Sequence, residues 1–527
     1  MPTKKTHRSK SRSGCITCKI RKIKCDEARP QCKRCTSSHR ECDGYLPQPE
    51  VRTARELREI VHQLGIVGPV SRALSRSSPD PPNEDGIYFD LFRRLTASSA
   101  EAFLPSSFWT RDVLQITDSE PAVWHAAVSL GALHRQWDFD SQYDFHASGS
   151  DSDYKRSSQE LASTAMNHYG RAISHARAIR EPSRLLVLSV MLQAIANVTG
   201  KWSQSQMHGL AGLRLLNQCL KSSIDHHAAV ELLERLDVQA MLCQDSQAPY
   251  PFGKVTSPDL FSCDPIRWPS DIEDYPQAVA VIFTMIRRYA LLGGALGAAV
   301  VSAEEYYRQR SRLSDDFTRW NERFSTLDQP RSCDENYNCK MSEKEVASLI
   351  IYRDTFRLLL EANLFGPESR WDGYLSYFER ILSNATTVAQ LIPSTPESSI
   401  SFEPAIITPL FLTAFRCRHP QVRRGAIKLL RSLKRREAMW TGSAAAAVAE
   451  RVMKIEEAGA DRQLSTPSSN ELAIYQATEM LWVPESKRVR EIVVCTDFSA
   501  RKVQLTMLMT STDENNLSEA TNETVLI

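Results

Sequence analysis

The residues of this chain best suited to chemistry are six cysteines near its start. They follow one another as Cys15-x2-Cys18-x6-Cys25-x6-Cys32-x2-Cys35-x6-Cys42. A Cys-x2-Cys step lets one turn of chain present two thiolates to the same tetrahedral zinc ion. Six thiolates can complete two tetrahedral sites only if two of the sulfur atoms bridge. The spacing therefore predicts two zinc ions (Zn2+) per chain, in closed sites whose role is structural.

Two other uses of these cysteines fit the sequence less well. A disulfide framework needs an oxidising compartment, and no apolar secretory stretch precedes Cys15 in the segment MPTKKTHRSKSRSG. Redox cysteines rarely occur as two matched triplets. We therefore expect a metal cluster.

The loop between Cys18 and Cys25 is strongly basic. Four of its six residues are cations, namely Lys19, Arg21, Lys22 and Lys24. Ile20 and Ile23 are three positions apart, so one helical turn is expected to point both inward and the cations outward. Clustered Lys and Arg side chains on a short helix suit the major groove of double-stranded DNA, where they can bond the acceptors of guanine. A merely solvated charged surface is the simpler alternative, which the concentration of cations on a metal-held loop disfavours.

At these residues the chain resembles the fungal zinc binuclear cluster (Zn2Cys6) transcription factors. The resemblance implies that Cys15 and Cys32 bridge. One zinc would then take Cys15, Cys18, Cys25 and Cys32, and the other Cys15, Cys32, Cys35 and Cys42. It also implies that Arg21 and Lys22 read bases in a target containing CGG triplets. We expect Lys19 and Lys24 mainly to attract phosphates.

Charge is distributed unevenly along the chain. Residues 1–50 hold thirteen Lys and Arg against five Asp and Glu, a net charge of +8, whereas the remainder carries −6. With 527 residues and 42% hydrophobic content, the chain can build a sizeable core beyond the cluster. The basic end suits a polyanion, and the rest reads as ordinary globular protein.

Composition divides the chain into five parts. Residues 68–86 hold four prolines and four serines, which marks a linker. Before it, Thr53-x-x-Glu56 forms a capping box that opens two apolar heptads. Two heptads leave three interpretations open: a coiled coil that makes a homodimer, a short docking helix, or a frayed segment. The expected parts are a basic arm (1–14), the zinc cluster (15–45), a linker with this short helix (46–86), a helical regulatory domain (87–510) and a mobile tail (511–527).

The large body is expected to be mainly α-helical. Leu185–Ile195 and Met207–Leu220 predict a helical hairpin, and Val489–Cys495 and Val503–Met509 predict a C-terminal β-hairpin. The longest apolar run, Tyr289–Ala303, is too short to span a membrane and predicts a core helix. The fold class is therefore mainly α, with a small zinc cluster, a linker, a large all-α regulatory domain and a β-hairpin.

The body also resembles the helical middle region found behind many fungal zinc clusters. Gly200-x-Trp202-x5-His208 and Cys417-Arg418-x-Pro420 are among the motifs that carry the likeness, from about residue 87 to 510. The resemblance implies a regulatory role without chemistry of its own.

An enzymatic body is the rival hypothesis, and the sequence holds no His-Glu-x2-His, Gly-x-Ser-x-Gly, P-loop or Gly-x-Gly-x2-Gly motif. Five histidines on expected helices are interpreted as packing residues, namely His125, His134, His168, His175 and His208. The basic run from Arg423 to Arg436 is interpreted as a solvated helix face, with contact to nucleic acid as the alternative.

The expected function is a nuclear, sequence-specific DNA-binding regulator of genes transcribed by RNA polymerase II. Its partners would be double-stranded DNA, the transcription machinery or co-regulators, and a second copy of the chain, with no membrane. Control of a metabolic or secondary-metabolite gene cluster is what the resemblance suggests. The alternative is an enzyme or scaffold whose helical body acts and whose zinc cluster only targets it. We do not expect an enzyme.

Overall fold

The computed structural model divides the chain into two compact units, Met1–Asp80 and Pro81–Ile527. The residues that the structure describes are 17–18, 21, 23, 25–26, 28, 31–38 and 42 in the first unit, and 84–100, 106–141, 152–219, 227–255, 272, 274–327, 342–392, 400–458, 483–497, 500–510 and 520–526 in the second. The expected dimerisation helix and most of the linker lie outside these residues.

The first unit contains one short helix among its described residues, α2 (Lys33–Thr36), and a core made of cysteines alone. Cys18, Cys25, Cys32, Cys35 and Cys42 are all buried. A segment this small lacks the apolar residues to hold a fold by itself, so its stability must come from whatever binds the thiolates.

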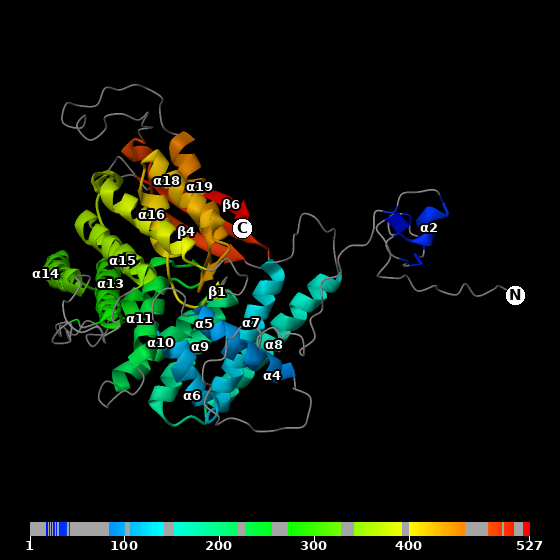
Figure 1. The fold of residues 1–527 in the computed structure, drawn as a ribbon. Coiled ribbons are helices and arrows are strands. Elements are labelled where there is room, and N and C mark those ends of the chain that lie inside the picture. The colour runs from blue at the N-terminus through cyan, green and yellow to red at the C-terminus, as the bar shows by residue number, and fades with distance from the viewer. Residues whose placement is uncertain are drawn as a thin grey trace, which may run out of the picture. The chain divides into compact units, whose positions relative to one another are not determined.

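The second unit is mainly α-helical, as expected (Figure 1). Its first half contains α4 (Glu84–Leu91), the π-helical turn η1 (Phe92–Thr96), α5 (Ala97–Ala100), a second π-helical turn η2 (Phe108–Asp112), α6 (Val113–Thr117), α7 (Pro121–Ser141), α8 (Ser152–Ala176), α9 (Pro182–Val198), α10 (Trp202–Cys219) and α11 (His227–Leu242). These helices share one hydrophobic core, and α9 lies within it, buried at every position from Leu186 to Asn197. A helix that is apolar all round has no solvent face to offer, which explains its central place.

The predicted helical hairpin is confirmed by α9 and α10. Gly200 makes the turn with a φ of 69°, a left-handed conformation that suits glycine. Close packing of α10 on α9 requires a second glycine, Gly212, because a Cβ atom there would lie 2.6 Å from Ser189 Oγ.

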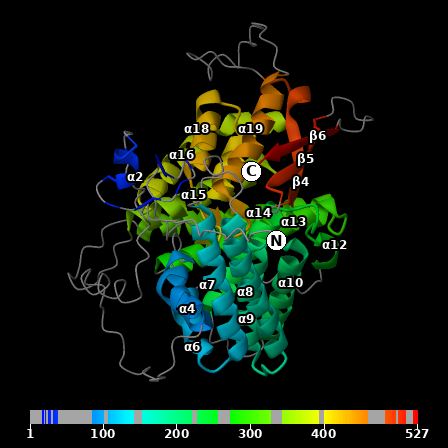
Figure 2. The same cartoon turned by 90° about the vertical axis from the view of Figure 1, so that its right-hand side faces the viewer.

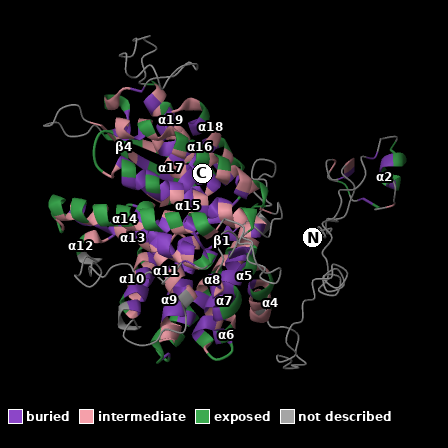
Figure 3. Ribbon diagram, turned by 60° about the vertical axis from the view of Figure 1, so that its left-hand side comes forward, coloured by how far each residue is buried: buried purple, intermediate pink, exposed green. Residues whose placement is uncertain are grey.

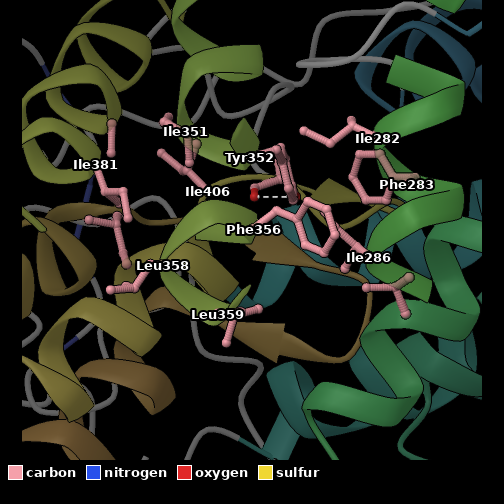
Figure 4. Packing of buried hydrophobic residues seen from close by; sticks show 14 of the residues in the cluster. Ile282, Phe283, Ile286, Ile351, Tyr352, Phe356, Leu358, Leu359, Ile381 and Ile406 are labelled. Atoms are coloured by element: carbon pink, nitrogen blue, oxygen red, sulfur yellow. Dashed lines mark hydrogen bonds between the residues drawn. The ribbon is translucent and has the colours of Figure 1, made fainter. Parts of the chain in front are cut away.

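The second half of the body forms its own core. It contains α12 (Phe252–Val255), α13 (Tyr275–Gly297), α14 (Ala303–Leu327), α15 (Glu343–Ala362), the 3-10 helix η3 (Glu368–Tyr374), α16 (Leu375–Gln390), α17 (Ile407–Arg416), α18 (Pro420–Ser432) and α19 (Gly442–Ala458). Figure 4 shows side chains of α13 and α15 meeting in this core, where the buried Tyr352 hydroxyl donates to the carbonyl of Ala405 at 2.6 Å. Figure 2 places α16, α18 and α19 at the opposite end of the body from α4 and α7–α10.

Helix α13 is the one described helix long and apolar enough to cross a membrane. It begins behind the cap Asp274, whose carboxylate accepts from the amide of Gln277 at 2.9 Å. Most of its residues, among them Ile282, Phe283 and Ile286, belong to the core. Burial within the body thus explains the apolar sequence of α13. The expected core helix at Tyr289–Ala303 is confirmed only for its first part, because α13 ends at Gly297 and residues 297–300 are exposed. By contrast, α14 lies on the outside and exposes much of its length (Figure 3).

A small three-stranded sheet joins the two halves of the body. Strand β1 (Ile400–Ser401) pairs in parallel with β2 (Arg436–Glu437), which pairs in antiparallel with β3 (Trp440–Thr441). Next to it, Glu403 accepts hydrogen bonds from Trp109 Nε1 and Arg235 Nη1, each at 3.0 Å. All three of these side chains are buried, so polar contacts tie η2 and α11 to the segment between β1 and α17.

The predicted C-terminal hairpin is confirmed by β4 (Val489–Asp497) and β5 (Lys502–Met509), which pair in antiparallel. The expected mobile tail is wrong for residues 520–526, because β6 (Ala520–Leu526) pairs with β5 along its whole length. None of its residues is buried. Pairing with the edge of β5 makes this mostly polar segment a strand, and its Val525 packs against the cluster that contains Val503 and Leu505. The 3-10 helix η5 (Glu485–Lys487) precedes this sheet of β4, β5 and β6. The sheet packs on α19 through Val448 and Val452.

Candidate metal centre and nucleic-acid interface

The buried thiols of the first unit fall into two groups that overlap at one residue. Cys18, Cys25 and Cys32 form the first group, and Cys32, Cys35 and Cys42 the second. Within each group the sulfur atoms all lie within 4.8 Å of one another, and Cys18 Sγ is 3.7 Å from Cys32 Sγ. Two thiolates on one tetrahedral zinc are about 3.8 Å apart, given a Zn–S distance of about 2.3 Å. The donor set therefore fits zinc.

These groups match the two expected ligand sets with Cys15 left out. Cys15 lies outside the described residues, so its part in either set stays a prediction. Cys32 belongs to both groups, which is the position of a bridging thiolate. Zinc bound here would hold the chain together and leave no coordination position for chemistry.

Local structure explains how the second group is presented. Cys32 is the N-cap of α2, and the amide of Cys35 donates to Cys32 Sγ at 3.3 Å. One helical turn thus aims both sulfur atoms the same way. In the first half, the amide of Arg21 donates to the carbonyl of Thr17 at 3.1 Å, so the basic loop begins as a helical turn.

Asp26 connects the two halves of the cluster, a role the sequence analysis missed. Its carboxylate oxygens accept from the amides of Lys33 and Arg34, both at 3.0 Å. The hydrogen bond from the Arg34 amide is the main reason that the pKa of the Asp26 carboxyl is lowered. The sequence signal was an aspartate directly after Cys25, the type of residue that caps a helix N-terminus.

One of the four predicted DNA-binding residues can be placed. Arg21 is half-buried, and its Nη1 donates to Ser38 Oγ at 3.1 Å. Lys19, Lys22 and Lys24 lie outside the described residues. The expectation that Ile23 points inward is wrong, since 39% of it is exposed. The described core of this unit consists of cysteines, and Ile23 is not part of it.

Most of the five histidines interpreted as packing residues do pack in the body. His134 lies 2.9 Å from Thr96 Oγ1, His208 lies 2.7 Å from the Tyr169 hydroxyl, and all of these groups are buried. Burial lowers the pKa of His208 to about 4, so its ring is neutral at pH 7.

The other three histidines lie together on α7 and α8. His168 is buried, with its Nε2 3.1 Å from Asp85 and its Nδ1 2.9 Å from His125 Nδ1. The pKa of His125 is lowered to about 4, mainly because the ring is partly buried and secondly because His168 lies beside it. His175 departs from the interpretation, because it is exposed and stacks on His125. It lies in the last turn of α8, where the end of the helix leaves it open to solvent on the side away from His125.

The basic run from Arg423 to Arg436 is the expected solvated face only in part, since Arg424, Lys428 and Arg431 of α18 and Lys434 after it are exposed. Arg423, Arg435 and Arg436 are buried rather than solvated. Arg424 and Arg431 are exposed but paired with Glu457 and Glu450 of α19. Three arginines of α18, namely Arg423, Arg424 and Arg431, thus face acidic positions of α19.

A buried ionic cluster lies where α17, α18 and α19 meet η3. Glu456 accepts from Arg418 Nη2 at 2.9 Å and from the amide of Val489 at 2.8 Å, and its other oxygen is 2.7 Å from Arg423 Nη1. Burial alone would raise the pKa of Glu456, but Arg418 and Arg423 lower it on balance. These charges neutralise one another inside the fold, which gives them a structural role.

Comparison with known proteins places this site and body in a family. The fungal Zn(2)-Cys(6) binuclear cluster domain matches residues 13–51, and the fungal specific transcription factor domain matches residues 88–452. The chain therefore belongs to the fungal transcription factors that carry this cluster, a domain that binds two zinc ions through six cysteines.

Curated relatives are similar over parts of the chain. The aspercryptin biosynthesis cluster-specific transcription regulator atnN of Emericella nidulans is 29% identical over 40% of this chain and 35% of its own length. The transcription regulator lscL of Purpureocillium lilacinum is 26% identical over 42% of this chain and 54% of its own length. The Zn(2)-C6 fungal-type transcription factor afumD of Aspergillus fumigatus is 35% identical over 24% of this chain and 32% of its own length. The chain thus matches about a third to a half of these relatives. No solved structure shows a significant match.

Proposed function

We propose that this chain is a nuclear, sequence-specific DNA-binding regulator of genes transcribed by RNA polymerase II. The observation that carries the proposal is the pair of thiol groups that share Cys32, within a domain whose family binds DNA. The zinc ligands are Cys15, Cys18, Cys25, Cys32, Cys35 and Cys42, with Cys15 and Cys32 bridging. Two zinc ions would supply only structural cohesion.

The basic loop that this cluster supports contacts the major groove. Arg21 and Lys22 bond base edges of a CGG-type triplet, while Lys19 and Lys24 attract phosphates. The net charge of +8 in residues 1–50 draws this end of the chain to DNA. The cations Lys4, Lys5, Arg8, Lys10 and Arg12 in the basic arm direct nuclear entry.

The helical body regulates or recruits rather than catalyses. Its buried charges are paired with one another, as Glu456 with Arg418 and Arg423 and Glu403 with Arg235. Such groups stabilise a fold and are not free to act on a substrate. Control of a metabolic or secondary-metabolite gene cluster is supported by the Emericella nidulans relative, which is a regulator specific to the aspercryptin biosynthesis cluster.

Binding-site selection from randomised duplexes tests this function. We expect the native chain to select a CGG-containing site. Arg21→Ala and Lys22→Ala should each lose about 1–3 kcal/mol of preference at one base, because a bidentate base contact is lost. Lys19→Ala should weaken binding to all sequences alike, as loss of a phosphate contact does. A native chain that selects no sequence, or unchanged preference in both base-contact variants, would overturn the assignment.

A further inference from the structure

The first unit contains a side-chain contact that reaches from the basic loop to the opposite half of the cluster. Arg21 Nη1 donates to Ser38 Oγ at 3.1 Å, across seventeen positions of sequence. Ser38 lies just beyond the end of α2, in the half that has no predicted base-reading residue. A flexible arginine is thus tethered to a distant element.

Ser38 is itself held in place by the end of α2. Its amide donates to the carbonyl of Cys35 at 3.1 Å. Its hydroxyl oxygen lies 2.8 Å from the carbonyl of Arg34 and 3.0 Å from that of Cys35. A hydroxyl has one proton to donate and two lone pairs, so it can bond one of these carbonyls and still accept from Arg21.

The start of α2 is fixed as well. Asp26 accepts from the amides of Lys33 and Arg34, which ties α2 to the residue after Cys25. The helix is therefore held at both ends, and Ser38 is a fixed point relative to the basic loop.

We propose that Ser38 is a positioning residue that orients the Arg21 guanidinium for base recognition. This inference rests on the proposed function, in which Arg21 contacts a base. Ser38 engages one N–H of Nη1 and leaves the edge formed by Nε and Nη2 to face two acceptors on a guanine. An arginine restrained before DNA arrives loses less conformational freedom on binding, and its fixed direction penalises the wrong base.

The test is binding-site selection with the full zinc-loaded chain and its Ser38→Ala variant. We expect discrimination at the base read by Arg21 to fall about three- to tenfold, the net size of one ordinary hydrogen bond. Zinc content and the salt dependence of binding should stay unchanged, because the Ser38 hydroxyl bonds no cysteine sulfur among the described contacts. Ser38→Thr keeps the hydroxyl and should restore discrimination.

Thr36→Ala is the matched control. The Thr36 hydroxyl donates to the carbonyl of Lys33 at 3.1 Å and, among the described residues, makes no hydrogen bond to Arg21. It should therefore leave base preference unchanged. Arg21→Ala is run alongside, and adding Ser38→Ala to it should change preference no further.

Three results would overturn the inference while leaving the function intact. They are unchanged discrimination in Ser38→Ala when Arg21→Ala does alter it, loss of zinc in Ser38→Ala, or failure of Ser38→Thr to restore discrimination. If Arg21→Ala itself leaves the preference unchanged, the base contact assigned under the proposed function is wrong, and the role of Ser38 is overturned with it.

Discussion

Glu456→Gln should strongly destabilise the helical body. The variant keeps the size of the side chain and removes its charge. Arg418 and Arg423 are only 6% and 1% exposed as side chains, so both cations would stay buried without their shared carboxylate. Breaking a buried ion pair from one side costs about 3–5 kcal/mol. We expect a loss near the lower end, because Arg418 keeps contacts to Glu368 and to the carbonyl of Arg416.

The neighbouring residue supplies a matched control. Glu457 pairs with Arg424, whose side chain is 48% exposed, so Glu457→Gln should cost no more than about 1 kcal/mol. Urea unfolding of the full chain, followed by far-UV circular dichroism, measures both variants. If Glu456→Gln cost as little as Glu457→Gln, the view that this cluster stabilises the junction of α17, α18 and α19 would be wrong.

Three further predictions concern other parts of the structure. Gly131→Ala should destabilise the body by about 1–3 kcal/mol in the same urea assay, because the added Cβ would lie 2.1 Å from the carbonyl oxygen of Tyr88. Gly170→Ala should instead stabilise the body by about 0.5–1 kcal/mol, because the added Cβ would have nothing within 4 Å. Asp26→Ala should weaken zinc binding about fivefold in a competition titration with a chelator, since loss of a helix cap costs about 1 kcal/mol, whereas Asp26→Asn should lose less. The pKa of Glu456 is lowered in the folded chain, so its stabilising effect should be present above the ordinary glutamate pKa and lost as the pH falls through the folded pKa. The native chain should therefore lose more stability in acid than Glu456→Gln. Equal losses in the two chains would contradict this.

The sequence predicts local features of this fold well. The cysteine spacing predicts a two-zinc cluster, because ligand geometry depends on a few neighbouring residues, and the resemblance to the zinc cluster family implies its two thiol groups. The apolar run at Leu185–Ile195 likewise predicts the buried helix α9. In both cases the residues that determine the structure lie within a short segment.

Contacts between distant segments could not be predicted in this way. Strand β6 is polar, and it forms because β5 offers a free edge. Arg423 resembles a solvated cation until α19 brings Glu456 beside it. The bond between Arg21 and Ser38 depends on how the two halves of the cluster fold together. Each outcome depends on a partner that the local sequence does not contain.

The most direct test of the central claim is DNA binding by the full chain before zinc removal, after chelation and after zinc is restored, with zinc counted by elemental analysis. Two zinc ions per chain, loss of sequence-specific binding on chelation and its recovery with zinc would be the result the account predicts. Fewer than two zinc ions in a chain that binds its site, or specific binding that survives complete chelation, would contradict it.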